Sequence, residues 1–103
     1  MTDKPTLTIE YCRQCRWLMR AAWMQQELLT TFAEELGGVT LNPGTGGIFE
    51  VRHGDRILWS RKERERFPEI TELKQIVRDA VAPEKSLGHS DHKTADRKNI
   101  SAE

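Results

Sequence analysis

Two cysteines separated by two residues, Cys12 and Cys15, are the residues of this chain best suited to chemistry. They are its only cysteines, and they stand between a short apolar run and a long helical pattern. We therefore expect a dithiol at the first turn of a helix that follows a strand, where free backbone N–H groups lower a thiol pKa. Such a pair can also close an intramolecular disulfide. The spacing predicts thiol redox chemistry.

Ordinary residues can supply the free energy needed to lower a thiol pKa at such a site. A cysteine with a pKa of about 8.5 is only about 3% thiolate at pH 7, and lowering that pKa to about 7 takes roughly 2 kcal/mol. The end of a helix supplies about 0.3 to 2 kcal/mol, and Arg13 and Arg16 add positive charge. One thiolate would attack a substrate disulfide and the other would resolve the mixed species. Helix-terminus physics favours Cys12 as the attacker, because the first cysteine of such a pair is usually the more exposed.

Half of a zinc site is the main alternative for the cysteine pair. Zinc takes four ligands, and the other candidates are His53, His89 and His92. His89 and His92 are spaced more tightly than the histidines of usual zinc fingers, so we expect no metal. A purely structural disulfide is disfavoured in a reducing compartment.

Length and charge restrict the class of protein. The 103 residues allow one domain, and 16 basic side chains balance 16 acidic ones. The balance gives no net field that would attract nucleic acid or an anionic membrane. No apolar stretch approaches the roughly 20 residues needed to cross a bilayer, and the first residues lack the apolar core of a signal peptide. We expect a cytoplasmic protein with neither nucleic acid nor membrane as a partner.

Hydrophobic periodicity predicts an α/β (α+β sandwich) fold of the order β-α-β-β-β-α, with a mixed four-stranded sheet and two helices. Such a strand–helix–strand crossover pairs its strands in parallel. We expect residues 1–83 to form the domain, and 84–103 to be a disordered tail because it has too few large apolar residues to order it. The expected elements are strands 7–11, 38–42, 47–52 and 56–60, helices 15–36 and 68–82, and a solvated loop at 61–66.

The first helix carries an apolar stripe whose expected members are Leu18, Ala21, Ala22, Leu28, Leu29, Phe32 and Leu36. Trp17 and Met24 flank this stripe and could extend it. Gly37-Gly38 is expected to end this helix, because the residue just past a helix often needs a left-handed backbone. Of the tryptophans Trp17, Trp23 and Trp59, one or two should lie in the core, and exposure of the rest would indicate a docking surface.

The order of these features resembles the selenoprotein W-like (Rdx) family. The resemblance rests on the strand–CxxC–helix unit, on Gly47-Ile48-Phe49-Glu50-Val51 and on Ile57-Leu58-Trp59-Ser60-Arg61-Lys62, and it covers about residues 6–82. It implies a thioredoxin-like fold and a thiol-based redox role. Selenocysteine members carry selenium at the position of Cys15, which argues for Cys15 as the nucleophile, so the order of attack stays open. Thioredoxins place a cis-proline beside the dithiol where this chain has Thr45-Gly46-Gly47.

These observations predict a thiol–disulfide oxidoreductase that cycles between the Cys12–Cys15 dithiol and its disulfide. Thr45, Gly46 and Gly47 are candidate substrate-binding residues because glycine lets a substrate approach closely, although loop geometry explains them equally well. Partners would be protein or small-molecule thiols and disulfides, and by analogy the electron donor is of the thioredoxin or glutathione type. No organic cofactor is expected, since no phosphate-binding glycine motif is present. The alternative is a redox-sensing interaction module without catalytic turnover.

Overall fold

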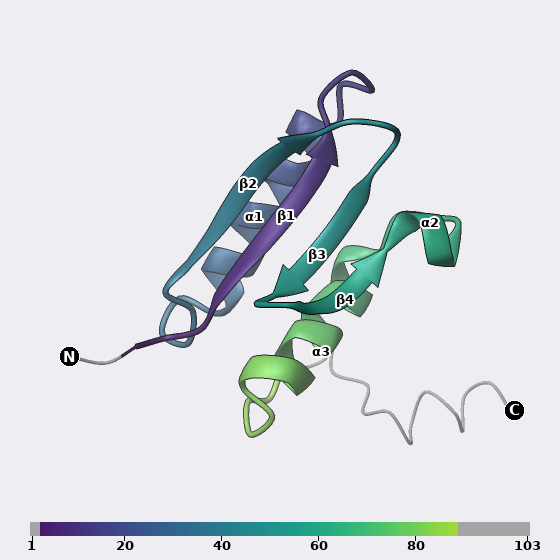
Figure 1. The fold of residues 1–103 in the computed structure, drawn as a ribbon. Helices are drawn as coiled ribbons and strands as arrows, with labels where there is room; N and C mark the ends of the chain where they lie inside the picture. Colours follow the sequence, from purple (N-terminus) through teal and green to yellow (C-terminus); the bar gives the residue numbers. More distant parts are fainter. Residues whose placement is uncertain (1–2, 89–103) are drawn as a thin grey trace, which may run out of the picture.

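A computed structural model describes residues 3–88, which form one mixed four-stranded sheet with helices packed on it (Figure 1). The strand order is β2-β1-β3-β4, with β1 parallel to β2 and antiparallel to β3, and with β3 antiparallel to β4. The expected fold class is confirmed. The elements are β1 (Thr6–Cys12), α1 (Leu18–Thr31), β2 (Gly38–Gly44), β3 (Phe49–His53), β4 (Arg56–Ser60), α2 (Arg61–Arg64) and α3 (Ile70–Val81).

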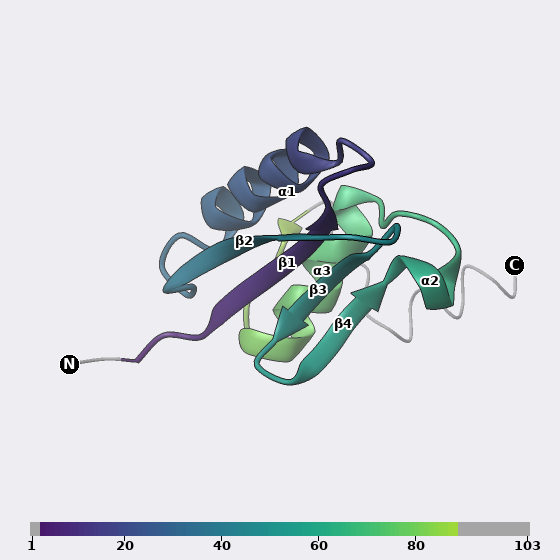
Figure 2. The same cartoon turned by 45° about the horizontal axis from the view of Figure 1, so that its top comes forward.

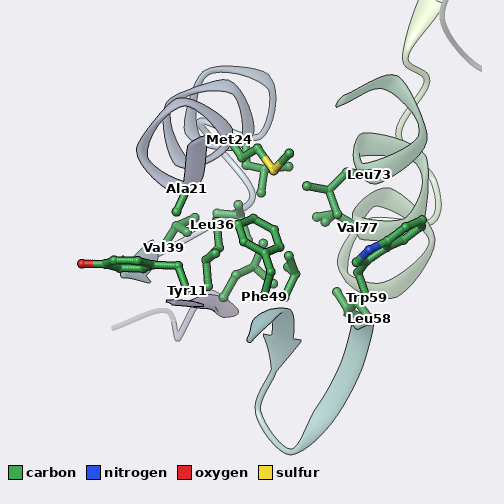
Figure 3. Close-up of a cluster of buried hydrophobic side chains, with 14 of the residues drawn as sticks. Tyr11, Ala21, Met24, Leu36, Val39, Phe49, Leu58, Trp59, Leu73 and Val77 are labelled. Carbon is green, nitrogen blue, oxygen red and sulfur yellow. The ribbon is translucent and has the colours of Figure 1, made fainter. Parts of the chain in front are cut away.

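Both long helices cover the same face of the sheet, which gives the domain two layers (Figures 1 and 2). Alternation in β1 turns Leu7 and Ile9 toward the helices, and both side chains are fully buried. Figure 3 shows the core between the layers, where Met24 of α1 lies close to Leu73 of α3 above the sheet residues. No helix within residues 3–88 is both long enough and apolar enough to cross a membrane.

The buried stripe of α1 differs from the expected one. Leu18 and Leu29 are exposed, whereas Met24 is buried together with Ala21 and Leu28. The core therefore takes a narrower set of positions three and four residues apart, and the remaining apolar residues of α1 face outward.

The end of α1 also differs from the expectation. The helix ends at Thr31, and turns continue the chain to Gly37. Neither Gly37 nor Gly38 has a left-handed backbone, and Gly37 has another role. Its amide donates to the carbonyl of Pro5, and a Cβ there would lie only 3.2 Å from the carbonyl oxygen of Lys4. Close approach to the N-terminal strand, rather than helix termination, explains this glycine.

The charged run after β4 is partly helical, so the expectation of a solvated loop at 61–66 was wrong for its first four residues. Ser60 caps α2, because its hydroxyl accepts a hydrogen bond from the amide of Glu63. Glu65 ends the helix with a left-handed backbone at φ 62°. The short helix leads the chain away from β4 toward α3.

The described chain continues past the expected domain end at residue 83. The guanidinium of Arg78 donates to the carbonyl of Lys85 at 2.9 Å, and the ammonium of Lys85 pairs with Glu35 at 3.3 Å. Leu87 packs against the core. The rest of the expected tail, residues 89–103, lies outside the described residues, and its disorder stays a prediction.

Candidate redox site

Cys12 and Cys15 are joined by a disulfide, with their Cα atoms 5.3 Å apart. Cys12 is the last residue of β1, and Cys15 lies in the turn between β1 and α1. The expectation that the pair occupies the first turn of the helix was wrong, because α1 begins at Leu18. The reason is local. Arg16 adopts a left-handed backbone at φ 63°, which an α-helix does not accommodate.

The two sulfur positions differ sharply in access to solvent. Cys12 is 1% exposed, whereas Cys15 is exposed. The expectation that Cys12 would be the more exposed cysteine is therefore wrong. Cys12 still belongs to the strand, where its amide donates to the carbonyl of Ile48 at 2.8 Å and its Cα pairs with that of Gly44. Cys15 lies beyond this pairing in an open turn.

The loop between β2 and β3 is attached to the dithiol segment at both of its ends. The carbonyl of Gly44 accepts a hydrogen bond from the amide of Arg13 at 3.0 Å, and the carbonyl of Ile48 accepts one from Cys12. Thr45, Gly46 and Gly47 lie between these two anchors, so the fold brings them next to the cysteine pair. Gly46 and Gly47 have φ values of 73° and 77°, a conformation that favours glycine. Loop geometry alone therefore accounts for both glycines.

Gly44 is a site residue whose role the sequence pattern did not reveal. A Cβ on Gly44 would lie 2.8 Å from Oε2 of Glu10 and 2.8 Å from Cγ2 of Ile48. The other carboxylate oxygen of Glu10 accepts from Arg52 at 2.9 Å, and Arg52 also donates to Glu50 at 2.9 Å. The hydrogen bond to Glu10 is the main reason that the pKa of Arg52 is raised. Glu10 and Cys12 are two residues apart in β1, so this ion-paired group shares a face of the sheet with Cys12.

An aromatic cluster fixes the chain immediately after the dithiol. Trp17 and Phe67 meet edge to face with ring centroids 4.9 Å apart, and Phe67 meets Phe49 in the same way at 5.1 Å. The guanidinium carbon of Arg20 lies 4.1 Å from the Phe67 centroid, and that of Arg61 lies 4.9 Å from the Trp17 centroid. The start of α1 is thus tied to the segment between α2 and α3. Nothing in the local sequence around Phe67 pointed to this contact.

The zinc alternative finds no support in the described part of the chain. Between residues 3 and 88, no group of three or more His, Cys, Asp or Glu side chains is placed to hold a metal ion. His53 ends β3 and is half-buried. His89 and His92 lie outside the described residues.

The family model of the Rdx family matches residues 6–79, which span the sheet, the dithiol and most of α3. The chain belongs to the Rdx family. The family match agrees with the resemblance found in the sequence and, with the closed Cys12–Cys15 pair, points to a redox function. No curated protein matches the chain.

Two solved structures resemble this Rdx protein along nearly their whole length. A protein from Bordetella parapertussis is 52% identical, with a TM-score of 0.75, and the match covers 77% of this chain and all of that one. A selenoprotein W-related protein from Vibrio cholerae is 50% identical, with a TM-score of 0.73, and the match covers 76% of this chain and 98% of that one. The thioredoxin-like architecture is therefore shared across the domain.

Proposed function

We propose that this Rdx-family protein is a thiol–disulfide oxidoreductase in which Cys15 attacks and Cys12 resolves. The difference in exposure between the two cysteines is the observation that carries the proposal. A substrate disulfide can reach Cys15 in the open turn, whereas Cys12 is enclosed by the strand pairing to β2 and by Ile48. Cys12 needs to reach only the Cys15 sulfur, to which it is already bonded in this structure.

The cycle consists of two thiol–disulfide exchanges. The Cys15 thiolate attacks one sulfur of a substrate disulfide, forms a mixed disulfide and releases the first substrate thiolate, which takes a proton from water. The Cys12 thiolate then attacks the Cys15 sulfur, closes the intramolecular disulfide and releases the second substrate thiolate. Two electrons pass from the dithiol to the substrate, and an external thiol or dithiol reductant returns two electrons to the protein. A cytoplasmic location, where thiols are kept reduced, suits this cycle.

Reaction of the reduced protein with hydroxyethyl disulfide, followed by intact-mass measurement, tests the assignment of roles. Wild type should release two mercaptoethanol molecules and end as the Cys12–Cys15 disulfide. Cys12→Ser should accumulate one mercaptoethanol adduct on Cys15, and Cys15→Ser should form its adduct at least about tenfold more slowly, because Cys12 is enclosed. Equal adduct rates in the two variants would refute the assigned order.

Turnover separates an oxidoreductase from a redox sensor. With dithiothreitol as the reductant, wild type should accelerate the reduction of hydroxyethyl disulfide over the uncatalysed rate, and both single variants should lose the acceleration. If the dithiol is oxidised rapidly but the reduction of hydroxyethyl disulfide is not accelerated, the oxidoreductase is refuted and the redox-sensing module remains.

We also propose that Thr45, Gly46 and Gly47 border the path by which a substrate reaches Cys15. Their support is the attachment of this loop on either side of Cys12. Thr45 is exposed, so a Thr45→Trp variant should fold normally and slow the reduction of a peptide disulfide more than that of hydroxyethyl disulfide. Equal rates for Thr45→Trp and wild type with both substrates would remove these residues from the proposed path.

A further inference from the structure

The part of α1 next to the dithiol carries three large apolar side chains that are exposed to solvent. Met19 is 82% exposed, Leu18 48% and Trp23 47%. Met19 and Trp23 are four residues apart and therefore neighbours on one side of the helix. The buried residues Ala21 and Met24 lie on the side of α1 away from Met19 and Trp23, so these two side chains are not needed for the core. Leu18, the first residue of the helix, lies at the border between the two sides. We call Leu18, Met19 and Trp23 the docking face.

The docking face begins where the reactive turn ends. Leu18 is the first residue of α1, and Cys15 lies three residues before it in the turn. Figure 1 shows that turn at the same end of the sheet as the start of α1. From Leu18 to Trp23 the helix rises about 7.5 Å, a distance that two or three residues of an extended peptide span. A polypeptide joined to Cys15 through a mixed disulfide can thus place a neighbouring side chain on this face.

Unpaired positive charge lies beside the docking face. Residues 11–26 contain Arg13, Arg16 and Arg20 and no Asp or Glu. The next residue, Glu27, lies one turn beyond Trp23 and is paired with Lys74 at 2.9 Å. Within the described residues, none of these three arginines takes part in an ion pair; Arg20 stacks on Phe67 instead. The turn that carries Cys15 therefore presents guanidinium groups that form no ion pair with a carboxylate of the described residues.

We propose that the docking face receives a polypeptide disulfide whose cysteine is flanked by a carboxylate and an apolar side chain. The apolar side chain would cover Met19 and Trp23, and the carboxylate would meet Arg13 or Arg16. The charge pattern selects an acidic polypeptide over a second copy of this chain, because the carboxylate of Glu27, one turn from Trp23, is already paired with Lys74, so this side of a second α1 offers these arginines no unpaired carboxylate. The inference rests on the proposed function and names its substrate class.

Three short peptides test the substrate class. Each is an acetylated and amidated pentapeptide whose central cysteine forms a mixed disulfide with thionitrobenzoate, so that attack on the peptide sulfur releases a coloured thiolate. One has glutamates next to the cysteine and leucines outside them, the second has lysines in place of the glutamates, and the third keeps the glutamates but has serines outside. We expect the reduced protein to react with the first about tenfold faster than with either of the others at low salt, and salt should narrow only the glutamate–lysine difference.

Variants locate the effect on the protein. Trp23→Ser should lower the rate with the first peptide about tenfold, and Ile57→Ser is its matched control, since Ile57 is also 47% exposed but lies on β4. Arg16→Asn should reduce the glutamate–lysine ratio, and asparagine tolerates the left-handed backbone at this position. Hydroxyethyl disulfide should react equally with wild type, Trp23→Ser and Ile57→Ser; for Arg16→Asn the readout is the glutamate–lysine ratio, in which any change in the reactivity of Cys15 itself cancels. Equal rates for the three peptides, or equal losses in Trp23→Ser and Ile57→Ser, would overturn the inference.

Two further outcomes are distinguishable. If neither wild type nor any variant accelerates disulfide exchange, the proposed function fails. A binding experiment then tests the docking face by itself. The amide NMR signals of residues 18–23 should shift when the first peptide, with serine in place of its cysteine, is added. No shift would refute the docking face. If sedimentation shows a dimer that Trp23→Ser abolishes, a second copy occupies the face and the inference is wrong.

Discussion

Replacing Gly44 by alanine should loosen the structure directly beneath the dithiol. The added Cβ would lie 2.8 Å from Cγ2 of Ile48 and 2.8 Å from Oε2 of Glu10, about 1 Å closer than a relaxed contact. Glu10 is flexible and can move aside by giving up its ion pair with Arg52, but Cγ2 of Ile48 is attached close to the backbone and cannot. The steric conflict with Ile48 therefore decides the cost.

Overpacking of this kind costs about 1–3 kcal/mol, and the smaller entropy of the unfolded alanine chain returns about 0.4–1 kcal/mol. We expect Gly44→Ala to lower the free energy of unfolding by about 1–2 kcal/mol, which lowers the Tm of a domain of this size by about 4–16 °C. Gly38→Ala is the matched control at the other end of β2. A Cβ there meets no atom within 4 Å, so this variant should be as stable as wild type or slightly more stable.

Thermal and urea unfolding of the oxidised proteins measure this difference. The effect should extend to the disulfide, because Gly44 pairs with Cys12 and accepts the amide of Arg13. Dithiothreitol should therefore reduce Gly44→Ala faster than Gly38→Ala. In a double-mutant cycle, the Ile48→Ala substitution should cost less in the Gly44→Ala background than in wild type. Equal stability of the two glycine variants, or strict additivity in the cycle, would refute the steric argument.

Three further predictions concern the frame of the site. The pKa of Glu72 is lowered, chiefly by its hydrogen bond with Arg66, so Glu72→Gln should be less stable than wild type at pH 7. Denaturant titrations at several pH values measure the difference in free energy of unfolding between the two proteins. This difference should shrink as the pH falls from the ordinary glutamate pKa of 4.5 through the lowered pKa of Glu72 in the folded protein. Trp59→Phe removes the hydrogen bond from Nε1 to the carbonyl of Arg66 and should cost about 1–2 kcal/mol in urea unfolding, and a loss within about 0.5 kcal/mol would argue against a role for that bond. Gly46→Ala should cost about 1–2 kcal/mol because of its left-handed backbone, and Gly46→Asn should cost less; equal losses would contradict this reason.

Much of the fold could be predicted from local patterns. Alternation marked the strands, and the hairpin around Gly54 has the turn residues that such connections require. The cysteine spacing also predicted that Cys12 and Cys15 can form a disulfide, because two sulfurs three residues apart are close in almost any turn. The pattern failed at Arg16, where a left-handed residue in a chain of helix-compatible side chains delays the start of α1. Neither periodicity nor composition encodes that conformation.

Some properties of the dithiol follow from the local sequence, and others follow only from the tertiary structure. The sequence by itself determined the strand order along the chain, the family and the presence of a CxxC pair, because each depends on residue type and short spacing. Only the tertiary structure decided that Cys12 is enclosed and Cys15 is open, since this follows from the pairing of β1 with Gly44 and Ile48, more than 30 residues away. It also decided which apolar residues of α1 face outward. Large apolar residues occur on both sides of that helix, so periodicity alone could not distinguish the side that packs on the sheet.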